Sequence, residues 1–407
     1  MRDIDIDNPY YARQWHLHTG FEHVEVDVRS SMRCDEAWSR LAGFGDPLIV
    51  VAATDSGCNL DHPAFGGMGK FAGWGYFDGG ELRTMGMPGS AAAKMYLPGA
   101  HHGTSMCALT SGVVGHSHPL GVAPGCRLLP IRLQTEANRA RISEYAMHRI
   151  LDYVSERADV LLVPWSKLPH FMLSKSVVDR IEELTSSGGR RGSGLVFVCA
   201  AGNSNCPIDI DADVAVPYEV VFGGDVQAEP LIKLSKTFRN VLASLPGVLH
   251  VSSISSLAQR CHYSCYGPGI DLCAPSSNSR AFRGDALRGL GLTTSTGDPE
   301  KPTNRFKGTS GAAALVAGVA ALVLSANPGL SALEVCRILQ SSASKDLSHT
   351  GYDLPPPTSP DAAWDHPLVP RCRRGSFDET GWSPWFGNGK VDALRAVTAA
   401  QTWQTTG

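Results

Sequence analysis

The sequence predicts an α/β fold built on a doubly wound, mostly parallel sheet with helices on both faces. Short apolar runs typical of buried parallel strands recur along the chain, at residues 48–53, 128–133, 160–163, 195–200 and 248–254. Between these runs, residues 142–157 and 177–184 carry apolar side chains at helical spacing. The alternation of strands and helices indicates βαβ units, whose crossovers are nearly always right-handed.

The composition is that of an ordinary globular protein. Of the 407 residues, 43% are hydrophobic and 18% are charged, which supplies enough apolar material for a large core. The net charge of −3 indicates neither nucleic acid nor an anionic membrane as a partner. The longest apolar run, near residues 311–326, is too short and too rich in Gly and Ala for a membrane span, so no membrane partner is expected.

The N-terminal residues and the cysteines bear on the cellular compartment. Residues 1–9 contain no apolar core of signal-peptide length and no small-residue cleavage site. The eleven cysteines are an odd number, and several, such as Cys199 and Cys273, lie in apolar runs, where a free thiol behaves as a small hydrophobic group. These observations predict a cytoplasmic protein; a mature exported fragment is the alternative, and one or two disulfides stay open.

The first candidate for a functional residue is a carboxylate at the end of a predicted strand. Asp55 follows the apolar residues 49–53 and precedes the turn residues Ser56 and Gly57. Ligands of open α/β sheets bind beyond the carboxyl ends of the strands, where a charge is buried and oriented without disrupting the core. Asp55 is therefore a candidate acid, although a strand followed by Asp and a turn is also a common helix cap.

The second candidate is a histidine at the start of a predicted small-residue helix. His102 precedes Gly103 and Thr104, and residues 108–114 continue as a buried helical pattern. Such a position holds an imidazole rigidly, as a general base requires. A histidine without a role is one alternative. A zinc cluster with His101, His116 and His118 is another, but no His-Glu-x-x-His or paired Cys-x-x-Cys pattern supports it.

The third and fourth candidates are Ser310 and Asn203. Ser310 lies in the first turn of a helix that is apolar nearly all round and ends near Asn327-Pro328, so the helix is predicted to be central and buried. The free N–H groups and the dipole at that helix end favour an anion. Asn203 follows the apolar run 195–200, and its amide can donate to an oxyanion. Taken singly, Ser310 reads as an N-cap and Asn203 as a turn residue.

Taken together, these residues resemble the subtilisin-like serine peptidases. The motifs are Asp-Ser-Gly at 55–57, His-Gly-Thr at 102–104, Ala-Gly-Asn at 201–203 and Gly-Thr-Ser at 308–310, in that order. Residues 8–17 resemble the opening of the catalytic domain in the kexin-like branch of that family. Further segments similar to the family are residues 121–130, 263–275, 326–328 and 387–393.

The resemblance implies a subtilisin-like fold and a serine endopeptidase that hydrolyses peptide or protein substrates without a required cofactor. Ser310 is then the nucleophile of an acyl-enzyme, His102 its base, Asp55 the group that orients His102, and Asn203 an oxyanion donor. The expected organisation is an N-terminal arm at 1–45 packed on a peptidase domain at 46–407. Long surface excursions are expected at 206–246 and 347–384, where a regulatory or substrate partner could bind.

The resemblance also assigns residues to substrate binding. Pro164, Trp165 and Ser166 fall on the strand that pairs with substrate in the family, and Ala201 and Gly202 fall beside it. Pro164 stands where family members often have Ser, and proline lacks a backbone donor. One main-chain contact to the substrate is therefore expected to be missing.

An acidic cluster follows the oxyanion candidate. Family members often carry structural calcium, and Asp209, Asp211 and Asp213 are weak candidate ligands for Ca²⁺, with a solvated acidic loop as the alternative. Carboxylates at this place would also favour Arg or Lys in the substrate, although Lys167 beside the substrate strand argues against that preference.

Three other functions stay open. A peptide ligase or macrocyclase could use the same triad, with the long excursions shielding the acyl-enzyme from water. A catalytically silent binding protein on a peptidase scaffold is a further alternative, although all four candidate residues are present. An α/β-hydrolase expects Gly-x-Ser-x-Gly with the acid and histidine after the serine, and Ala312 breaks that pattern.

Overall fold

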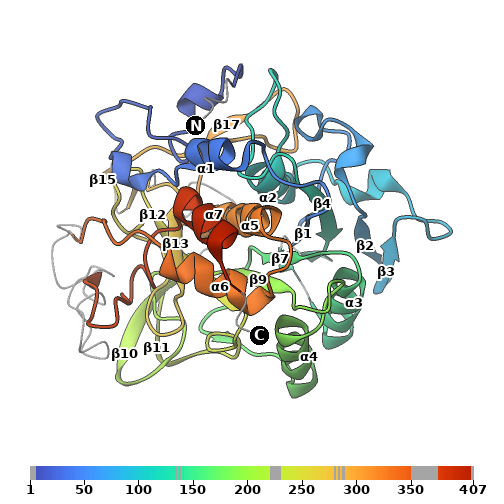
Figure 1. Ribbon diagram of the computed structural model, residues 1–407. Helices are drawn as coiled ribbons and strands as arrows, with labels where there is room; N and C mark the ends of the chain where they lie inside the picture. The colour runs from blue at the N-terminus through green and yellow to red at the C-terminus, as the bar shows by residue number, and fades with distance from the viewer. Residues whose placement is uncertain are drawn as a thin grey trace.

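An eight-stranded sheet forms the centre of the protein (Figure 1). The computed structural model describes residues 6–133, 135–136, 139–140, 142–220, 231–278, 281–282, 285–286, 289–349 and 375–404. The strands of the central sheet are β1 Val50–Asp55, β2 Gly75–Asp78, β3 Glu81–Thr84, β4 Arg127–Arg132, β7 Val160–Val163, β9 Val196–Ala200, β12 Val248–Ile254 and β13 Leu272–Pro275. Their order is β13-β12-β9-β7-β1-β4-β2-β3, and neighbours run parallel except for β3, which is antiparallel to β2.

Helices cover both faces of this sheet because alternate residues of its strands point to opposite sides. In β1, Val51 and Ala53 join the larger core, whereas Val50 and Ala52 join the core on the other face. The larger core packs against α1 Cys34–Leu41, α2 His101–Ser111, α5 Thr309–Ala326, α6 Ala332–Ser341 and α7 Ala393–Thr402. The other core packs against α3 Glu144–Ser155 and α4 Lys175–Ser186.

The predicted fold class is confirmed, and the predicted strands lie within two residues of the observed ones. The predicted strands 160–163 and 248–254 coincide with β7 and β12. Residues 48–53 were predicted as a strand, but β1 begins and ends two residues later, so that Asp55 is its last residue. The carboxylate is thus held by the sheet itself.

The helix α5 runs through the centre of the molecule (Figure 1). Its eighteen residues are long and apolar enough to cross a membrane, which among the described helices is true of α5 alone. However, 89% of that stretch is buried by other parts of the protein. The apolar character of α5 is therefore that of a core helix surrounded by a sheet and other helices.

The N-terminal arm packs into the same core as α5. Trp15 and Trp38 are almost completely buried there, and their indole N–H groups donate to the carbonyl oxygens of Gly291 and Val122 at 2.9 and 2.8 Å. The helix α1 lies against α7, near the other end of the sequence. Trp15 and Trp38 of the arm thus form part of the same hydrophobic core as residues of the segment 46–407.

The excursion at 206–246 contains a long β-hairpin, which the sequence analysis did not predict. The strands β10 Ile210–Val220 and β11 Leu231–Asn240 pair antiparallel, and β11 also pairs with β8 His170–Phe171. Leu231 and Leu234 on β11 are 49% and 66% exposed. Residues 221–230 lie outside the described residues, as does most of the second predicted excursion, at 350–374.

Short elements complete the described structure. The two-stranded sheets are β5 Thr135–Glu136 with β6 Arg139–Ala140, β14 Ala281–Phe282 with β15 Asp285–Ala286, and β16 Leu292–Thr294 with β17 Thr303–Phe306. The 3-10 helices are η1 Tyr11–Arg13, η2 Val28–Ser30, η3 Pro63–Phe65, η4 Met68–Lys70 and η5 Ala92–Met95.

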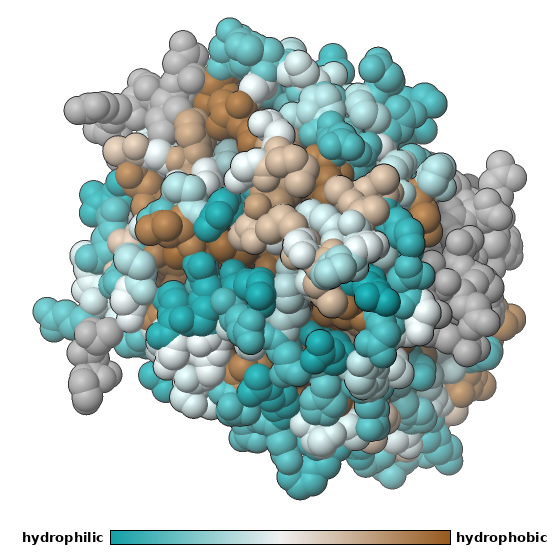
Figure 2. Space-filling model, turned by 90° about the vertical axis from the view of Figure 1, so that its right-hand side faces the viewer, coloured by the Kyte–Doolittle hydropathy of each residue, from teal (hydrophilic) through white to brown (hydrophobic). Residues whose placement is uncertain are grey.

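Part of the molecular surface is apolar. Figure 2 shows the side on which β2 and β3 lie, with hydrophobic residues gathered across its upper half above a largely hydrophilic lower part. Met85 and Met87, which follow β3, are 46% and 39% exposed, and Leu97 further along the same connection is 43% exposed. The chain between β3 and α2 therefore contributes apolar side chains to the surface.

Candidate active site

The end of β1 and the start of α2 bring Asp55 and His102 together. The Oδ2 atom of Asp55 lies 2.7 Å from Nδ1 of His102. The other carboxylate oxygen, Oδ1, accepts a hydrogen bond from the backbone N–H of Ser56 at 2.6 Å. Asp55 is only 8% exposed. Both oxygens of this nearly buried carboxylate thus have partners, and the imidazole is fixed by one of them.

Glycine at position 103 allows this close approach. A Cβ atom placed on Gly103 would lie 2.0 Å from the carbonyl oxygen of Gly57 and 3.0 Å from Cβ of Asp55. The N–H of Gly103 also donates to Oγ of Ser56 at 3.1 Å. The start of α2 therefore rests directly on the turn after β1, and only glycine fits there.

The start of α5 brings Ser310 to the far side of the imidazole. Its Oγ atom lies 3.0 Å from Nε2 of His102. Ser310 is the second residue of α5 and is 5% exposed. Two positions before it lies Gly308, whose φ of +103° belongs to the region that residues other than glycine rarely adopt. Three residues that are 47 and 208 positions apart in sequence thus form one chain of hydrogen bonds.

Asn203 lies next to this serine, in the loop after β9. Its Oδ1 atom accepts hydrogen bonds from the N–H and Oγ1 of Thr309, at 2.8 and 3.0 Å. Because Oδ1 is occupied in this way, the Nδ2 donor is turned to the opposite side. A Cβ atom on Gly308 would lie 3.3 Å from Nδ2 of Asn203 and 3.2 Å from Oγ of Ser310. The amide donor and the serine hydroxyl therefore converge on the same small space.

The electrostatics of the site suit a general base. Partial desolvation of the imidazole lowers the pKa of His102, but the negative charge of Asp55 and the hydrogen bond to it raise the pKa above its ordinary value. The His102 side chain is 43% exposed, and the ring of Phe306 on β17 lies 5.7 Å from it, centre to centre. The imidazole is thus oriented by its hydrogen bond to Asp55, while part of its ring is open to solvent.

Two further residues hold the loop before Ser310, and the sequence analysis assigned neither a role. The N–H of Gly308 donates to the Tyr263 hydroxyl at 2.9 Å, and Oγ of Ser276 donates to the Gly308 carbonyl at 2.9 Å. The two hydroxyl groups lie 3.0 Å apart. Tyr263 belongs to one of the segments that resemble the family, but a buried hydroxyl contact across 45 residues leaves no local signal in a sequence.

The predicted substrate residues lie in two adjacent segments. The indole N–H of Trp165 donates to Oγ1 of Thr54 at 3.1 Å, which fixes the chain just after β7. A Cβ atom on Gly202 would lie 2.8 Å from Oγ of Ser166, so the loops after β7 and β9 touch. Ser166 is exposed, whereas Pro164, Ala201 and Gly202 are buried. The geometry places all five residues near Asn203; their contact with substrate stays a prediction.

The predicted calcium ligands do not form a metal site. Oδ1 of Asp209 lies 3.3 Å from the guanidinium of Arg239, and Asp211 forms an ion pair with the same side chain. Among the described residues, no group of three or more His, Cys, Asp or Glu side chains is arranged to hold a metal ion. The sequence analysis missed Arg239, which lies on the neighbouring strand. One guanidinium balances only part of the negative charge of Asp209, Asp211 and Asp213, so the preference for Arg or Lys in a substrate stays a prediction.

A cysteine pair lies behind the oxyanion loop. The N–H of Ser204 donates to Sγ of Cys265 at 3.4 Å, and Sγ of Cys206 lies 3.9 Å from the same sulfur atom. The ten cysteines among the described residues are all buried and free. At these positions the thiols act as small core groups that support the loop carrying Asn203.

Comparisons with known proteins place this geometry in context. A family model described as the subtilase family, peptidase S8, matches residues 47–388. The chain is 25% identical over 416 residues to a calcium-dependent protease of Nostoc sp., which covers 96% of the chain and 51% of that relative. It is 30% identical over 268 residues to mycosin-3 of Mycobacterium tuberculosis, which covers 60% of the chain and 54% of mycosin-3. The chain thus spans about half the length of these relatives.

Solved structures show the same fold. A protease from Pseudoalteromonas arctica superposes with a TM-score of 0.60 and 22% identity, over 97% of this chain and 99% of that one. At this level of identity the likeness concerns the arrangement of the sheet and helices alone.

Proposed function

The chain belongs to the subtilase family, and from this premise we propose that it is a serine endopeptidase that cleaves peptide bonds through an acyl-enzyme on Ser310. One observation carries the proposal. The imidazole of His102 lies between Oδ2 of Asp55 at 2.7 Å and Oγ of Ser310 at 3.0 Å. Both distances are those of hydrogen bonds. The two hydrogen bonds connect a nucleophile, a base and the acid that orients the base.

The geometry supports the following steps. The Nδ1–H group of His102 donates a hydrogen bond to Asp55, which leaves a free lone pair on Nε2. His102 takes the proton of Ser310 through this lone pair as Oγ attacks the peptide carbonyl carbon. The imidazolium that forms is stabilised by the carboxylate of Asp55. His102 then gives the proton to the leaving amine, and the C–N bond breaks. His102 then takes a proton from water as the water oxygen attacks the acyl carbon, and it returns this proton to Oγ of Ser310 as the bond between Oγ and the acyl carbon breaks, which releases the new carboxyl end.

Two donors serve the oxyanion of the tetrahedral intermediate. One is Nδ2 of Asn203, which is aimed by the two hydrogen bonds that Oδ1 accepts from Thr309. The other is the backbone N–H of Ser310, which lies in the first turn of α5 where N–H groups have no partner within the helix. The positive end of the α5 dipole adds to the stabilisation of negative charge.

The substrate backbone would run along the chain after β7, at Trp165 and Ser166. Ser166 is exposed beside Gly202, so a peptide laid there would meet both loops. Pro164 offers a carbonyl oxygen and no N–H, which leaves the pairing with one donor fewer than an ordinary strand. We therefore expect substrate binding to depend more on the fit of side chains than on backbone hydrogen bonds to this segment.

Hydrolysis is favoured over ligation by the exposure of the site. Because 43% of the His102 side chain is exposed, water reaches the position from which it attacks the acyl-enzyme. A ligase would need to exclude that water.

Calcium and the compartment are secondary proposals. The Nostoc relative is named a calcium-dependent protease. Two of the three predicted ligands, Asp209 and Asp211, are paired with Arg239, so their carboxylates do not fit a calcium ion and no step is assigned to one. The ten free, buried cysteines support a reducing compartment, and on that ground we propose the cytoplasm.

Proteolysis by matched variants tests the proposed function. The wild-type chain and Ser186→Ala, a substitution of an exposed serine on α4, are expected to digest an unfolded protein such as reduced casein at equal rates. Ser310→Ala is expected to lose this activity while keeping its circular dichroism spectrum. Equal digestion by folded Ser310→Ala would show that another group cleaves the substrate.

A further inference from the structure

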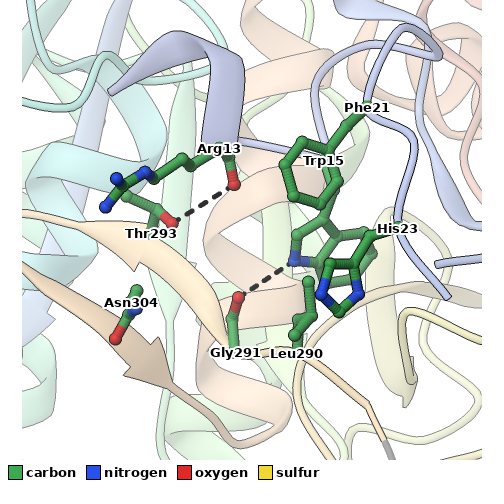
Figure 3. Close-up of a pocket in the computed structure, with 8 residues that line it drawn as sticks. All are labelled: Arg13, Trp15, Phe21, His23, Leu290, Gly291, Thr293 and Asn304. Atoms are coloured by element: carbon green, nitrogen blue, oxygen red, sulfur yellow. Dashed lines mark hydrogen bonds between the residues drawn. The ribbon is translucent and has the colours of Figure 1, made fainter. Parts of the chain in front are cut away.

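A pocket lies between the N-terminal arm and the hairpin formed by β16 and β17. It has a volume of about 250 Å³ and opens to solvent (Figure 3). Arg13, Trp15, Phe21 and His23 of the arm form one side. The chain leading into β16 and Asn304 of β17 form the other. No step of the proposed reaction uses this pocket.

The walls of the pocket are held in place by contacts of the protein itself. The indole N–H of Trp15 donates to the Gly291 carbonyl at 2.9 Å, and Oγ1 of Thr293 donates to the Arg13 carbonyl at 3.3 Å. Both bonds join the arm to the hairpin across more than 270 residues, and Figure 3 draws both. Trp15 is 1% exposed. The pocket is therefore formed before any ligand arrives.

The two ends of the pocket differ in chemistry. Phe21 and His23 stack with their rings 5.9 Å apart and lie at one end, beside Trp15 (Figure 3). Arg13 and Asn304 lie at the other end, and both are exposed. Among the described residues, the guanidinium of Arg13 has no ion-pair partner. A ligand that fits both ends carries an apolar or aromatic group next to a carboxylate.

The strand β17 links the pocket to the active site. Asn304 and Phe306 lie on this four-residue strand, and the Phe306 ring lies 5.7 Å from that of His102. At about 3.3 Å per residue, Asn304 lies about 7 Å beyond Phe306 along the strand. Only four positions separate Phe306 from Ser310 in the sequence. A peptide held at Ser310 thus reaches the pocket with a few extended residues.

The direction of the proposed reaction decides which part of the substrate arrives there. The acyl part lies towards Asn203 and Ser166, because the oxyanion donor and the loop after β7 are on that side of Ser310. The leaving amine takes its proton from Nε2 of His102 and so departs on the His102 side. Phe306 and β17 are on the His102 side, so the pocket faces the leaving segment.

We propose that this pocket is a substrate-recognition site for the leaving segment, and that it binds an aromatic or large aliphatic residue next to an Asp or Glu, about four residues after the cleaved bond. The proposal rests on the proposed peptidase function. The apolar side chain packs against Phe21, and the carboxylate pairs with the guanidinium of Arg13 and the amide of Asn304. Such contacts, made away from the reacting bond, select among polypeptides that share the same cleavage sequence.

Cleavage of matched fluorogenic peptides tests the proposal. All peptides share one acyl half, and their six-residue leaving halves carry Phe-Asp, Ala-Ala or Phe-Lys at the fourth and fifth positions. For the wild-type chain, kcat/KM is expected to be about tenfold higher for Phe-Asp than for Ala-Ala, with Phe-Lys close to Ala-Ala. The ratio between Phe-Asp and Ala-Ala should fall to about one in Arg13→Gln and in Phe21→Ala. Arg40→Gln, which removes an exposed arginine of α1, should keep the wild-type ratio.

Direct binding separates this proposal from the proposed function. The six-residue Phe-Asp leaving peptide, labelled at its end, is titrated into full-length Ser310→Ala and into Ser310→Ala with Arg13→Gln, and fluorescence anisotropy is followed. We expect saturable binding that weakens about tenfold with Arg13→Gln. Such binding without cleavage of any peptide would refute the peptidase and leave the pocket as a binding site. Cleavage with the same Phe-Asp to Ala-Ala ratio in all variants, or binding that Arg13→Gln does not weaken, would refute the role proposed for the pocket.

Discussion

The contact between Gly103 and the turn after β1 gives the sharpest quantitative prediction. A Cβ atom added at Gly103 would lie 2.0 Å from the Gly57 carbonyl oxygen, whereas separations under 3.0 Å essentially never occur. The start of α2 and the turn must then move apart by at least the difference, about 1 Å. The hydrogen bond from His102 to Asp55, now 2.7 Å, would lengthen to about 3.7 Å, beyond hydrogen-bonding range.

The expected consequence of Gly103→Ala is a loss of catalysis larger than the loss of stability. A displacement of about 1 Å in a catalytic group lowers the rate by about 10²-fold, and overpacking of this kind lowers the free energy of unfolding by about 1–3 kcal/mol. The assay is kcat and KM on a fluorogenic peptide, with circular dichroism and urea unfolding on the same sample. KM should change less than kcat, because the displaced contact orients the catalytic imidazole and does not itself bind substrate.

A matched glycine substitution serves as the control. An added Cβ at Gly69 in η4 meets no atom within 4 Å, and its φ is not in the left-handed region. Gly69→Ala should therefore keep the wild-type kcat. A folded Gly103→Ala variant with unchanged kcat would refute the reasoning, because it would mean that the Asp55–His102 contact tolerates the shift or contributes nothing.

Three further predictions concern the same site. Asn203→Ala should lower kcat by about 10²–10³-fold with little change in KM, the range known for removing one oxyanion donor from a subtilisin; an unchanged kcat would show that Nδ2 does not face the oxyanion. Because His102 must be neutral to accept the serine proton and its pKa is raised, kcat/KM should fall as the pH drops through a midpoint above 6.5; Asp55→Asn should move that midpoint to lower pH, and an unmoved midpoint would assign it to another group. Tyr263→Phe leaves the buried N–H of Gly308 without its partner and should lower the free energy of unfolding by about 1–3 kcal/mol in urea titrations; a loss within error would mean that water replaces the hydroxyl.

Much of the sheet was predictable because its strands are buried on both faces. Such strands read as short apolar runs, and the runs at 160–163 and 248–254 coincide with β7 and β12. The four candidate residues were found for a related reason. All four lie close to the end of an element with a strong pattern: Asp55 ends β1, Asn203 is in the loop after β9, and His102 and Ser310 are the second residues of α2 and α5.

The parts that escaped prediction depend on contacts between distant residues. β11 carries exposed Leu231 and Leu234 beside charged residues, so its pattern did not reveal a hairpin. The pairing of Arg239 with Asp209 and Asp211 engages two of the three predicted calcium ligands across a strand pair that no local pattern indicated. The walls of the pocket between the arm and β17 are likewise held together by hydrogen bonds between residues far apart in the chain.

Active-site labelling tests the central claim most directly. A fluorophosphonate reacts with a serine hydroxyl only where a base activates it, and peptide mapping by mass spectrometry identifies the modified residue. We predict a single adduct, on Ser310, that forms more slowly as the pH falls and does not form in a folded His102→Ala variant. An adduct on a different serine with Ser310 unmodified, or equal labelling of Ser310 without the imidazole, would contradict the account.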